Sequence, residues 1–383
     1  MFQFATATQI VFGDGSFREL PKVVPGFGTS ALLVLGESER FGDVAVELLA
    51  SAGVRAQRAR VTGEPTVANI LELIDVAREA RVEFVVGVGG GSVIDGAKAV
   101  AALLANPGDP LDFLEVIGRG KPLALASLPF VAVPTTAGTG AEATKNAVLA
   151  STEQRVKVSL RSDSMLPRVA LVDPELTLSL PPALTAATGL DALTQVLEPF
   201  VSCQSNPLTD ALTREALMRA SRSLRRAYHD GQDRAARSDM ALVSLFGGIA
   251  LANAKLGAVH GFAGPIGGMF PAPHGAVCAR LLPLVVATNV EALRARAAEN
   301  PSLERYAEVA RIFTGRASAQ AEDAAVWLTE LVNELGVPSL RAYGIEGTHV
   351  SDVVQKAKRA SSMQGNPIVL TDEELTRTLE AAL

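Results

Sequence analysis

The chain contains little cysteine, histidine and aromatic residue. Among 383 residues there are two cysteines, four histidines, one tryptophan and 5% aromatic residues. Two cysteines cannot form a disulfide framework, although a single bridge between Cys203 and Cys278 remains open. So low a content is typical of a reducing cytoplasm. The pattern around the two residues predicts that Cys278 packs in a helix core and that Cys203 lies in a loop or at a helix end.

The sequence also lacks an excess of positive charge and a long apolar run. Its formal net charge is −6, which argues against a nucleic acid or an anionic membrane as partner. The first positive charge is Arg18, and no uninterrupted apolar segment precedes it, so a secretory signal is not expected. No run of about 18 apolar residues is present, so we expect no transmembrane helix. These absences predict a soluble, cytoplasmic protein that binds a small molecule.

A chain of this length exceeds what one hydrophobic core usually supports, and we expect two domains, 1–180 and 181–383. In the first, short β-branched runs alternate with helical segments, which predicts a parallel Rossmann-like sheet with helices on both faces. The expected strands are 31–35, 54–61, 84–88, 130–133 and 169–172, and the expected helices are 41–52, 66–80 and 92–105.

The second half has no comparable strand signal and predicts an all-α domain. Apolar residues recur at helical spacing, with charged outer faces. The segments concerned are 184–200, 208–228, 234–254, 303–313, 319–335, 350–360 and 373–383.

Two glycine-rich loops follow apolar runs in the first half. In the first loop, Gly89, Gly90, Gly91 and Ser92 precede a helix, and glycine leaves no side chain between backbone amides and a ligand. The N-terminus of that helix would direct free N–H groups at a phosphate. A tight turn that uses glycine only for steric reasons is the alternative, but the second loop, 134–142, raises the odds and suggests a dinucleotide.

Two histidines and an acidic residue suggest a metal site in the second half. His260 and His274 are each followed by glycine and are separated by three prolines, which indicates two elements that converge. Asp191 and Gln195 lie four residues apart, on one face of a helix, with Glu198 nearby. Carboxylate and imidazole suit iron and zinc, although a structural role for these buried polar residues is the more common case.

Together these motifs resemble the iron-dependent alcohol dehydrogenase family, whose fold is shared with dehydroquinate synthase. The resemblance spans nearly the whole chain, in the family's order, and it implies a dinucleotide-binding α/β domain, a helical domain, a metal in the cleft between them and a homodimer. It assigns the pyrophosphate to Gly90, Gly91 and Ser92 and the nicotinamide ribose to Lys157. Other cofactor contacts implied by position are Asp95, Thr135, Thr136 and Thr139.

The family's four metal-ligand positions correspond to Asp191, Gln195, His260 and His274. The second of these is normally histidine, so Gln195 is the main departure, and a neutral amide oxygen would lower metal affinity. Gly264 is another departure, because many relatives have histidine there. The expected ion is Fe²⁺ or Zn²⁺, with Asp191, His260 and His274 as the catalytic residues.

The implied reaction is hydride transfer between a nicotinamide and a small alcohol, aldehyde or ketone. The family's acid that selects NAD aligns with Gly36, which would leave room for NADP, whereas Glu37 and Glu39 favour NAD slightly. A metal-free reductase similar to maleylacetate reductase is the first alternative, favoured by the loss of one imidazole. A lyase similar to dehydroquinate synthase fits less well, because no charged residue lies between His260 and His274. A noncatalytic protein would have damaged phosphate loops.

Overall fold

A computed structural model describes residues 1–383 except 152 and 155. The chain forms two compact units. The α/β unit contains residues 5–136 and 140–177, and the helical unit contains residues 1–4, 137–139 and 178–383. Residues 137–139 of the second glycine-rich loop therefore belong to the helical unit.

The α/β unit is built on a six-stranded parallel sheet with the order β1-β8-β5-β4-β2-β3. The predicted fold class, a parallel Rossmann-like sheet followed by a helical part, is confirmed. One edge strand, β1, was not predicted from the sequence, because it has four residues and none of them is buried. The strands are β1 (Gln9–Phe12), β2 (Ser30–Leu35), β3 (Arg55–Arg60), β4 (Phe84–Gly89), β5 (Phe130–Pro134) and β8 (Val169–Val172).

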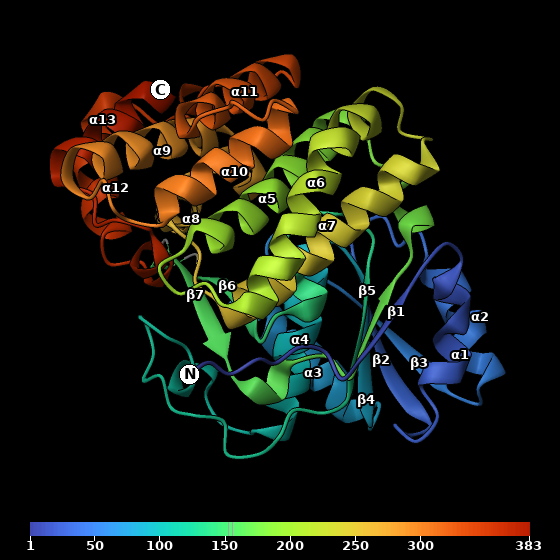
Figure 1. The fold of residues 1–383 in the computed structure, drawn as a ribbon. Coiled ribbons are helices and arrows are strands. Elements are labelled where there is room, and N and C mark those ends of the chain that lie inside the picture. Colours follow the sequence, from blue (N-terminus) through green and yellow to red (C-terminus); the bar gives the residue numbers. More distant parts are fainter. Residues whose placement is uncertain (152, 155) are drawn as a thin grey trace. The chain divides into compact units, whose positions relative to one another are not determined.

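Helices cover both faces of this sheet (Figure 1). Successive side chains of a strand point to opposite faces: in β2, Leu32 packs with the cluster under α3 (Val67–Glu79) and α4 (Gly91–Ala105), whereas Leu33 packs with the cluster under α1 (Leu20–Val23) and α2 (Gly42–Ser51). Because both faces of β2, β4, β5 and β8 are buried, these four strands are apolar throughout, which explains why the sequence lacked alternation there. The edge strand β3 (RAQRAR) has no buried residue.

An antiparallel hairpin, β6 (Asn146–Ser151) and β7 (Val156–Arg161), forms a second sheet in the same unit. It was not predicted, although its inner residues do alternate. Ala147, Leu149 and Val158 are buried in the cluster that α4 also joins. Thr66 forms an isolated bridge with Ala150.

The helical unit contains α5 to α13 around one large apolar cluster. His260 and His274 lie in two separate helices, α8 and α9, as the prolines indicated, although Pro265 lies inside α8. The helices are α5 (Pro182–Val201), α6 (Pro207–His229), α7 (Arg234–Asn253), α8 (Ala258–Met269), α9 (His274–Arg296), α10 (Ser302–Thr314), α11 (Ala321–Glu334), α12 (Val350–Ala357) and α13 (Asp372–Ala382).

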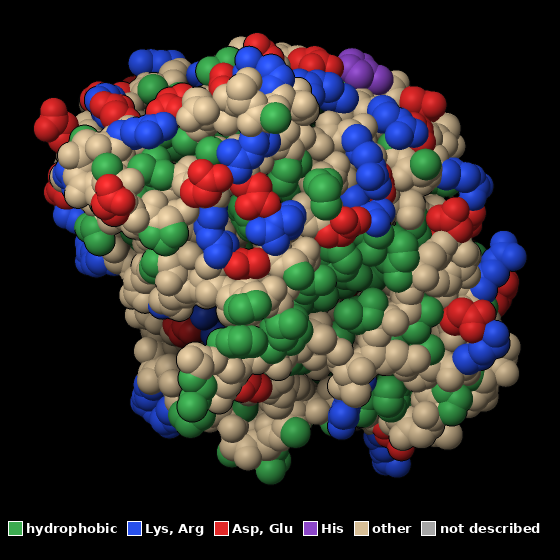
Figure 2. Space-filling view, viewed as in Figure 1, with side chains coloured by type: hydrophobic (Ala, Val, Ile, Leu, Met, Phe, Trp, Pro, Cys, Tyr) green, Lys and Arg blue, Asp and Glu red, His purple; other side chains and the backbone are tan. Residues whose placement is uncertain are grey.

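Two of these helices, α7 and α9, are long and apolar enough to cross a membrane by length and composition alone. Of their most apolar windows, 67% and 78% of the residues are buried inside the protein, which fits core helices. On the face drawn in Figure 2, basic and acidic side chains are interspersed and no field of a single sign forms.

Candidate active site

Helix α5 carries an unusual number of buried polar side chains. Asp191 is 2% exposed, Gln195 3% and Glu198 4%, while the apolar residues beside them pack into the large cluster. Burying a carboxylate is unfavourable unless it is paired or hydrogen-bonded. The hydrogen-bond and ion-pair partners of these three residues therefore indicate the function of α5.

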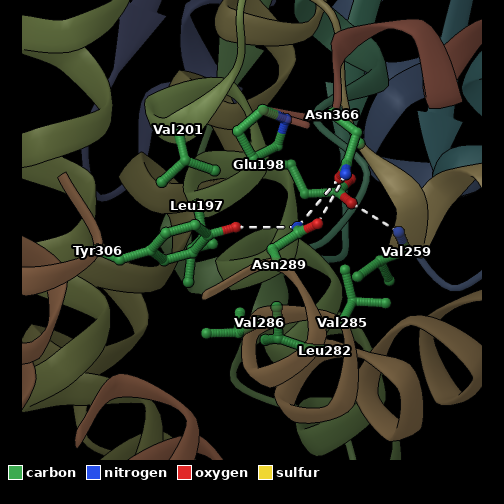
Figure 3. Close-up of a pocket in the computed structure, with 12 residues that line it drawn as sticks. Leu197, Glu198, Val201, Val259, Leu282, Val285, Val286, Asn289, Tyr306 and Asn366 are labelled. Carbon is green, nitrogen blue, oxygen red and sulfur yellow. Dashed lines mark hydrogen bonds between the residues drawn. The ribbon is translucent and has the colours of Figure 1, made fainter. Parts of the chain in front are cut away.

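Glu198 fixes the start of α8. Its Oε1 accepts a hydrogen bond from the backbone N–H of Val259 at 2.7 Å, and Asn366 Oδ1 accepts one from Ala258 N at 3.2 Å. These bonds satisfy first-turn donors that have no partner within a helix. A Cβ at Gly257 would lie 2.8 Å from Glu198 Oε1, so this approach requires glycine. Figure 3 shows Glu198 and Asn366 side by side in a small pocket, with Asn289 bonded to Asn366.

Glu198 also orients His260. Its Oε2 lies 2.6 Å from His260 Nδ1, so the neutral imidazole carries its proton on Nδ1 and donates it to the carboxylate. His260 Nε2 is then a lone-pair donor, and it is buried without a hydrogen-bond partner among the described residues. A carboxylate behind a histidine is the usual arrangement around metal-binding imidazoles.

Helix α9 begins at His274 and packs closely on α5. A Cβ at Gly275 would lie 2.5 Å from the carbonyl oxygen of Ala187, so glycine is needed for the two helices to approach. This contact places His274 beside Asp191. One turn further along α9, the fully buried Cys278 has its Sγ 3.6 Å from His274 Nε2.

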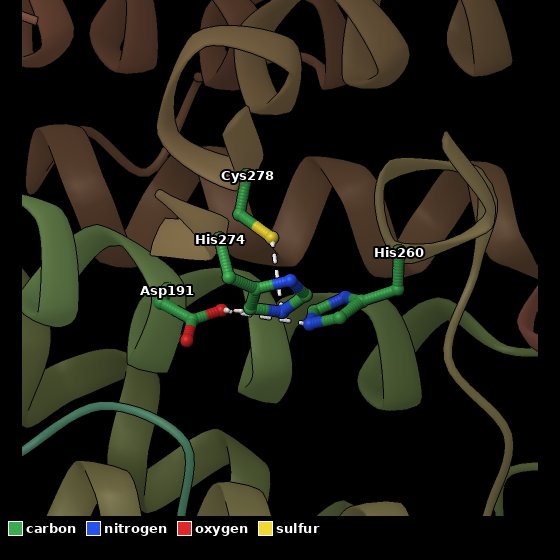
Figure 4. A group of neighbouring side chains, drawn as sticks. All are labelled: Asp191, His260, His274 and Cys278. Carbon is green, nitrogen blue, oxygen red and sulfur yellow. Dashed lines mark hydrogen bonds and ion pairs between the residues drawn. The ribbon is translucent and has the colours of Figure 1, made fainter. Parts of the chain in front are cut away.

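Four side chains from α5, α8 and α9 thus converge (Figure 4): Asp191, His260, His274 and Cys278. One ligand atom from each lies within 4.8 Å of all the others. Asp191 Oδ1 is 3.5 Å from His260 Nε2 and 3.7 Å from His274 Nε2. Asp191 Oδ1 is also buried without a hydrogen-bond partner among the described residues. Asp191 Oδ1 and His260 Nε2 are thus two potential metal ligands that lack hydrogen bonds and lie close together, and one metal ion would bind both.

The electrostatics of the group agree with this interpretation. Burial raises the pKa of Asp191, but the imidazoles of His274 and His260 outweigh it and hold that pKa below its ordinary value. Cys278 and Asp191 together raise the pKa of His274 to about 9, against the effect of burial. Burial lowers the pKa of His260, but Cys278 and Glu198 overcome it and raise that pKa well above its ordinary value. The site therefore favours a positive charge between its acidic groups.

Gln195, predicted as a further ligand, has its amide in another contact. Its Nε2 donates a hydrogen bond of 2.6 Å to the carbonyl oxygen of Thr139, and its side chain packs against Gly247 of α7. That it ligates a metal remains a prediction. Cys278 is the residue that the sequence placed in a helix core without a role. Its spacing of four from His274 was the available signal.

The first glycine-rich loop connects β4 to α4 as expected. Gly90 is the N-cap of α4, with extended backbone. None of Gly89, Gly90 and Gly91 has a positive φ, so unusual backbone angles do not require glycine here; at Gly89 the reason is space. A Cβ at Gly89 would lie 2.6 Å from Val93 Cβ. The first-turn N–H groups, which include that of Ser92, have no partner within the helix.

The other predicted cofactor residues lie in the α/β unit, apart from Thr139. Thr135 N donates to Gly89 O at 2.9 Å, which joins the two loops, and the Thr136 side chain lies against Gly90. Asp95 Oδ2 accepts a hydrogen bond from Val148 N at 3.0 Å, and Lys157 Nζ pairs with Glu64 at 3.0 Å. Their contacts with a cofactor remain predictions.

Gly36 and Glu37 directly follow β2, and Glu37 is exposed. Glu39, in the same segment, has a φ of 44°. Its carboxylate binds Arg60 and lies 3.4 Å from Arg58 Nη1. Acidic groups therefore do follow the strand end where an adenosine ribose would bind.

Two buried charged residues, Lys98 and Glu142, lie beside the second loop. Lys98 Nζ donates to Ala141 O, Thr144 Oγ1 and Asn146 O, each at 2.8 Å. Burial lowers the pKa of Lys98 to about 8 and raises the pKa of the buried Glu142 to about 7. Lys98 thus ties α4 to the segment that follows the loop.

Glu142→Gln is expected to raise thermal stability increasingly with pH. The unfolded chain releases the proton of Glu142 near 4.5 and the folded chain near 7. The stability that this group contributes is therefore present below 4.5 and lost as pH rises to about 7. The melting temperature of the variant relative to the parent should increase by about 2 to 4 °C or more between about pH 5 and about pH 8. The exposed Glu47→Gln is the control, and a pH-independent difference for Glu142→Gln would contradict the argument.

Comparisons with known proteins agree with this geometry. The family model for iron-containing alcohol dehydrogenase matches residues 7–174, and the model for the C-terminal part of the Fe-containing alcohol dehydrogenase family matches residues 185–383. The chain belongs to the iron-containing alcohol dehydrogenase family. Alcohol dehydrogenase 4 of Saccharomyces cerevisiae is 36% identical over 319 residues, which are 83% of this chain and 80% of the relative.

Solved structures of the family extend the likeness to the whole chain. A crystal structure of 1,3-propanediol oxidoreductase is 32% identical, with a TM-score of 0.92 and complete coverage of both chains. Sulfoacetaldehyde reductase from Bifidobacterium kashiwanohense, solved in complex with NAD⁺, is 28% identical with a TM-score of 0.86 and covers 99% of this chain and 98% of its own. The prediction of an oxidoreductase that interconverts an alcohol and a carbonyl compound with a nicotinamide is confirmed.

Proposed function

We propose that this iron-containing alcohol dehydrogenase interconverts a small, uncharged primary alcohol and its aldehyde, uses NAD(H), and binds a divalent iron or zinc ion through Asp191, His260 and His274. The observation that carries the proposal is the convergence of these three side chains, with Asp191 Oδ1 and His260 Nε2 buried and unsatisfied among the described residues. No charged residue lies between His260 and His274, which supports an uncharged substrate.

In the reduction direction, the carbonyl carbon would receive a hydride, which a bound NADH would supply, and the carbonyl oxygen would take up a proton. A divalent ion held by Asp191, His260 and His274 would supply Lewis-acid stabilisation of charge on that oxygen. The protein's part is to hold the ligands in place: Glu198 keeps the proton of His260 on Nδ1, and the close contact of α5 with Gly275 fixes His274. A Cβ at Gly264 would contact nothing within 4 Å. Water at this position can supply the proton that a histidine would handle.

The preference for NAD rests on the segment after β2. Glu37 is exposed there, and Glu39 is held by Arg58 and Arg60. Carboxylates in this position accept hydrogen bonds from ribose hydroxyls and repel a 2′-phosphate. Arg58 and Arg60 both pair with Glu39, and Arg58 also pairs with Asp43, so these arginines are less able to bind that phosphate. The NAD⁺ complex of the sulfoacetaldehyde reductase supports the same choice.

The enzyme acts as a cytoplasmic homodimer with no nucleic-acid or membrane partner. The net charge of −6 and the paucity of cysteine support the location and the absence of such partners. In support of a dimer, β1 lies at the edge of the sheet with its second side unpaired among the described strands. Such an edge can pair with another chain.

The proposal is tested with purified protein treated with a chelator and reloaded with Fe²⁺ or Zn²⁺. Reduction of short aldehydes should disappear on chelation and return with the metal, and kcat/KM should be higher with NADH than with NADPH. Full activity in the chelated protein would favour the metal-free reductase instead. That alternative is supported by Gln195, which replaces one imidazole ligand. Activity only with NADPH would contradict the choice of cofactor.

A further inference from the structure

The fourth metal-ligand position of this family is altered in the chain. Gln195 stands where the resemblance implies histidine, and its amide nitrogen is held by the Thr139 carbonyl at 2.6 Å. A carbonyl oxygen accepts a hydrogen bond only from the NH₂ group of an amide, so Thr139 fixes the orientation of the Gln195 amide. The thiol of Cys278, from α9, does lie in the cluster, within 4.8 Å of a ligand atom of Asp191, His260 and His274.

We propose that Cys278 is the fourth protein ligand, so that the ion is bound by one oxygen, two nitrogens and one sulfur. The inference rests on the metal-dependent function proposed above and refines it. The distances between neighbouring donors are 3.5 Å for Asp191 to His260, 3.7 Å for Asp191 to His274 and 3.6 Å for His274 to Cys278. Tetrahedral ligands with metal bonds of about 2.0 to 2.3 Å lie about 3.3 to 3.6 Å apart. Three of the six separations therefore match a tetrahedral site, and all six lie within 4.8 Å.

A buried cysteine is more often a small apolar residue than a ligand, and the neighbours of Cys278 decide between the two. A packing residue would face apolar side chains, whereas this sulfur faces His274 Nε2 and lies within 4.8 Å of Asp191 and His260 donor atoms. Two of those atoms are unsatisfied among the described residues. A single metal ion could bind Asp191, His260 and His274 and also the sulfur of Cys278.

The change of ligand alters which metal the site prefers. A thiolate is softer than an imidazole and favours zinc over iron. It also brings a negative charge where the usual histidine is neutral, and the thiol releases one proton to solvent when the ion binds. Asp191 and Cys278 together would then neutralise a divalent ion. We expect tighter binding of Zn²⁺ than of Fe²⁺.

Cobalt substitution tests the inference without relying on activity. The metal-free full-length enzyme is titrated with Co²⁺, and a sulfur-to-cobalt charge-transfer band in the near ultraviolet is expected. Cys278→Ser should lose this band and bind Zn²⁺ about 100-fold more weakly. Cys203→Ser is the matched control, because Cys203 is the other cysteine and is exposed, and it should keep both the band and the affinity.

X-ray absorption of the zinc-loaded parent enzyme gives a test that needs no variant. One sulfur neighbour at about 2.3 Å is expected. Bound metal with only nitrogen and oxygen neighbours, or a band that survives in Cys278→Ser, would overturn the role of Cys278 and leave the proposed function standing. Failure of the parent to bind Co²⁺ or Zn²⁺ would overturn both, and the activity of the chelated enzyme then identifies the metal-free reductase.

Discussion

His260→Ala is expected to lower kcat/KM for aldehyde reduction by about 10³-fold or more. His260 Nε2 is buried, unsatisfied among the described residues and 3.5 Å from Asp191 Oδ1. Removal of this imidazole takes away one ligand and leaves the carboxylate of Glu198 without its partner. Metal affinity should fall with activity, as measured by competition with a chromogenic chelator.

The binding of NADH should change by less than about 2-fold in this variant, because both glycine-rich loops keep their sequence and the metal ligands supply none of the loop amides. Fluorescence titration with NADH measures this directly. His229→Ala is the control: His229 lies at the exposed end of α6 and pairs with Glu334 at 3.0 Å. A His260→Ala enzyme with near-normal rates would show that the cluster is structural.

The parallel sheet and most helices were predictable because their signals are local. Each buried strand is a short apolar run, and the helices have their own periodicity, several of them ending near glycine or proline. The β6–β7 hairpin was missed, because half-buried alternation over six residues is a weak signal. Strand β1 is held in the sheet by β8, about 160 residues away in the sequence, and such a long-range partner cannot be seen in the strand itself.

The sequence was enough to predict most residues of the site, but not how they are arranged in space. Asp191, His260 and His274 come from three helices, and their meeting depends on the approach of α9 to α5 at Gly275. The pairing of His260 with Glu198 required knowledge of where α8 begins. Cys278 was overlooked because a lone cysteine within an apolar helix ordinarily packs in a core, and only its neighbours distinguish it from such a residue.

Glu198→Gln is expected to weaken metal binding by about 10- to 100-fold, although the side chain keeps its size. In the parent, the two carboxylate oxygens accept from Val259 N at 2.7 Å and from His260 Nδ1 at 2.6 Å. An amide has one oxygen and one NH₂ group. If the oxygen stays with Val259, the NH₂ group faces His260 Nδ1 and forces the imidazole proton onto Nε2, the atom that must bind the ion.

The buried Glu142→Gln is the matched control, because it neutralises a buried glutamate in the other unit and should leave zinc affinity unchanged. Calorimetric titration of the metal-free proteins with Zn²⁺ gives the affinities, and melting temperatures in chelator show whether each variant is folded. If Glu198→Gln lowers the melting temperature but binds Zn²⁺ like the parent, Glu198 serves only to anchor α8. If Glu198→Gln folds normally but binds Zn²⁺ more weakly, the carboxylate acts through the tautomer of His260. A role in anchoring α8 alone would not change the protonation of His260 Nε2.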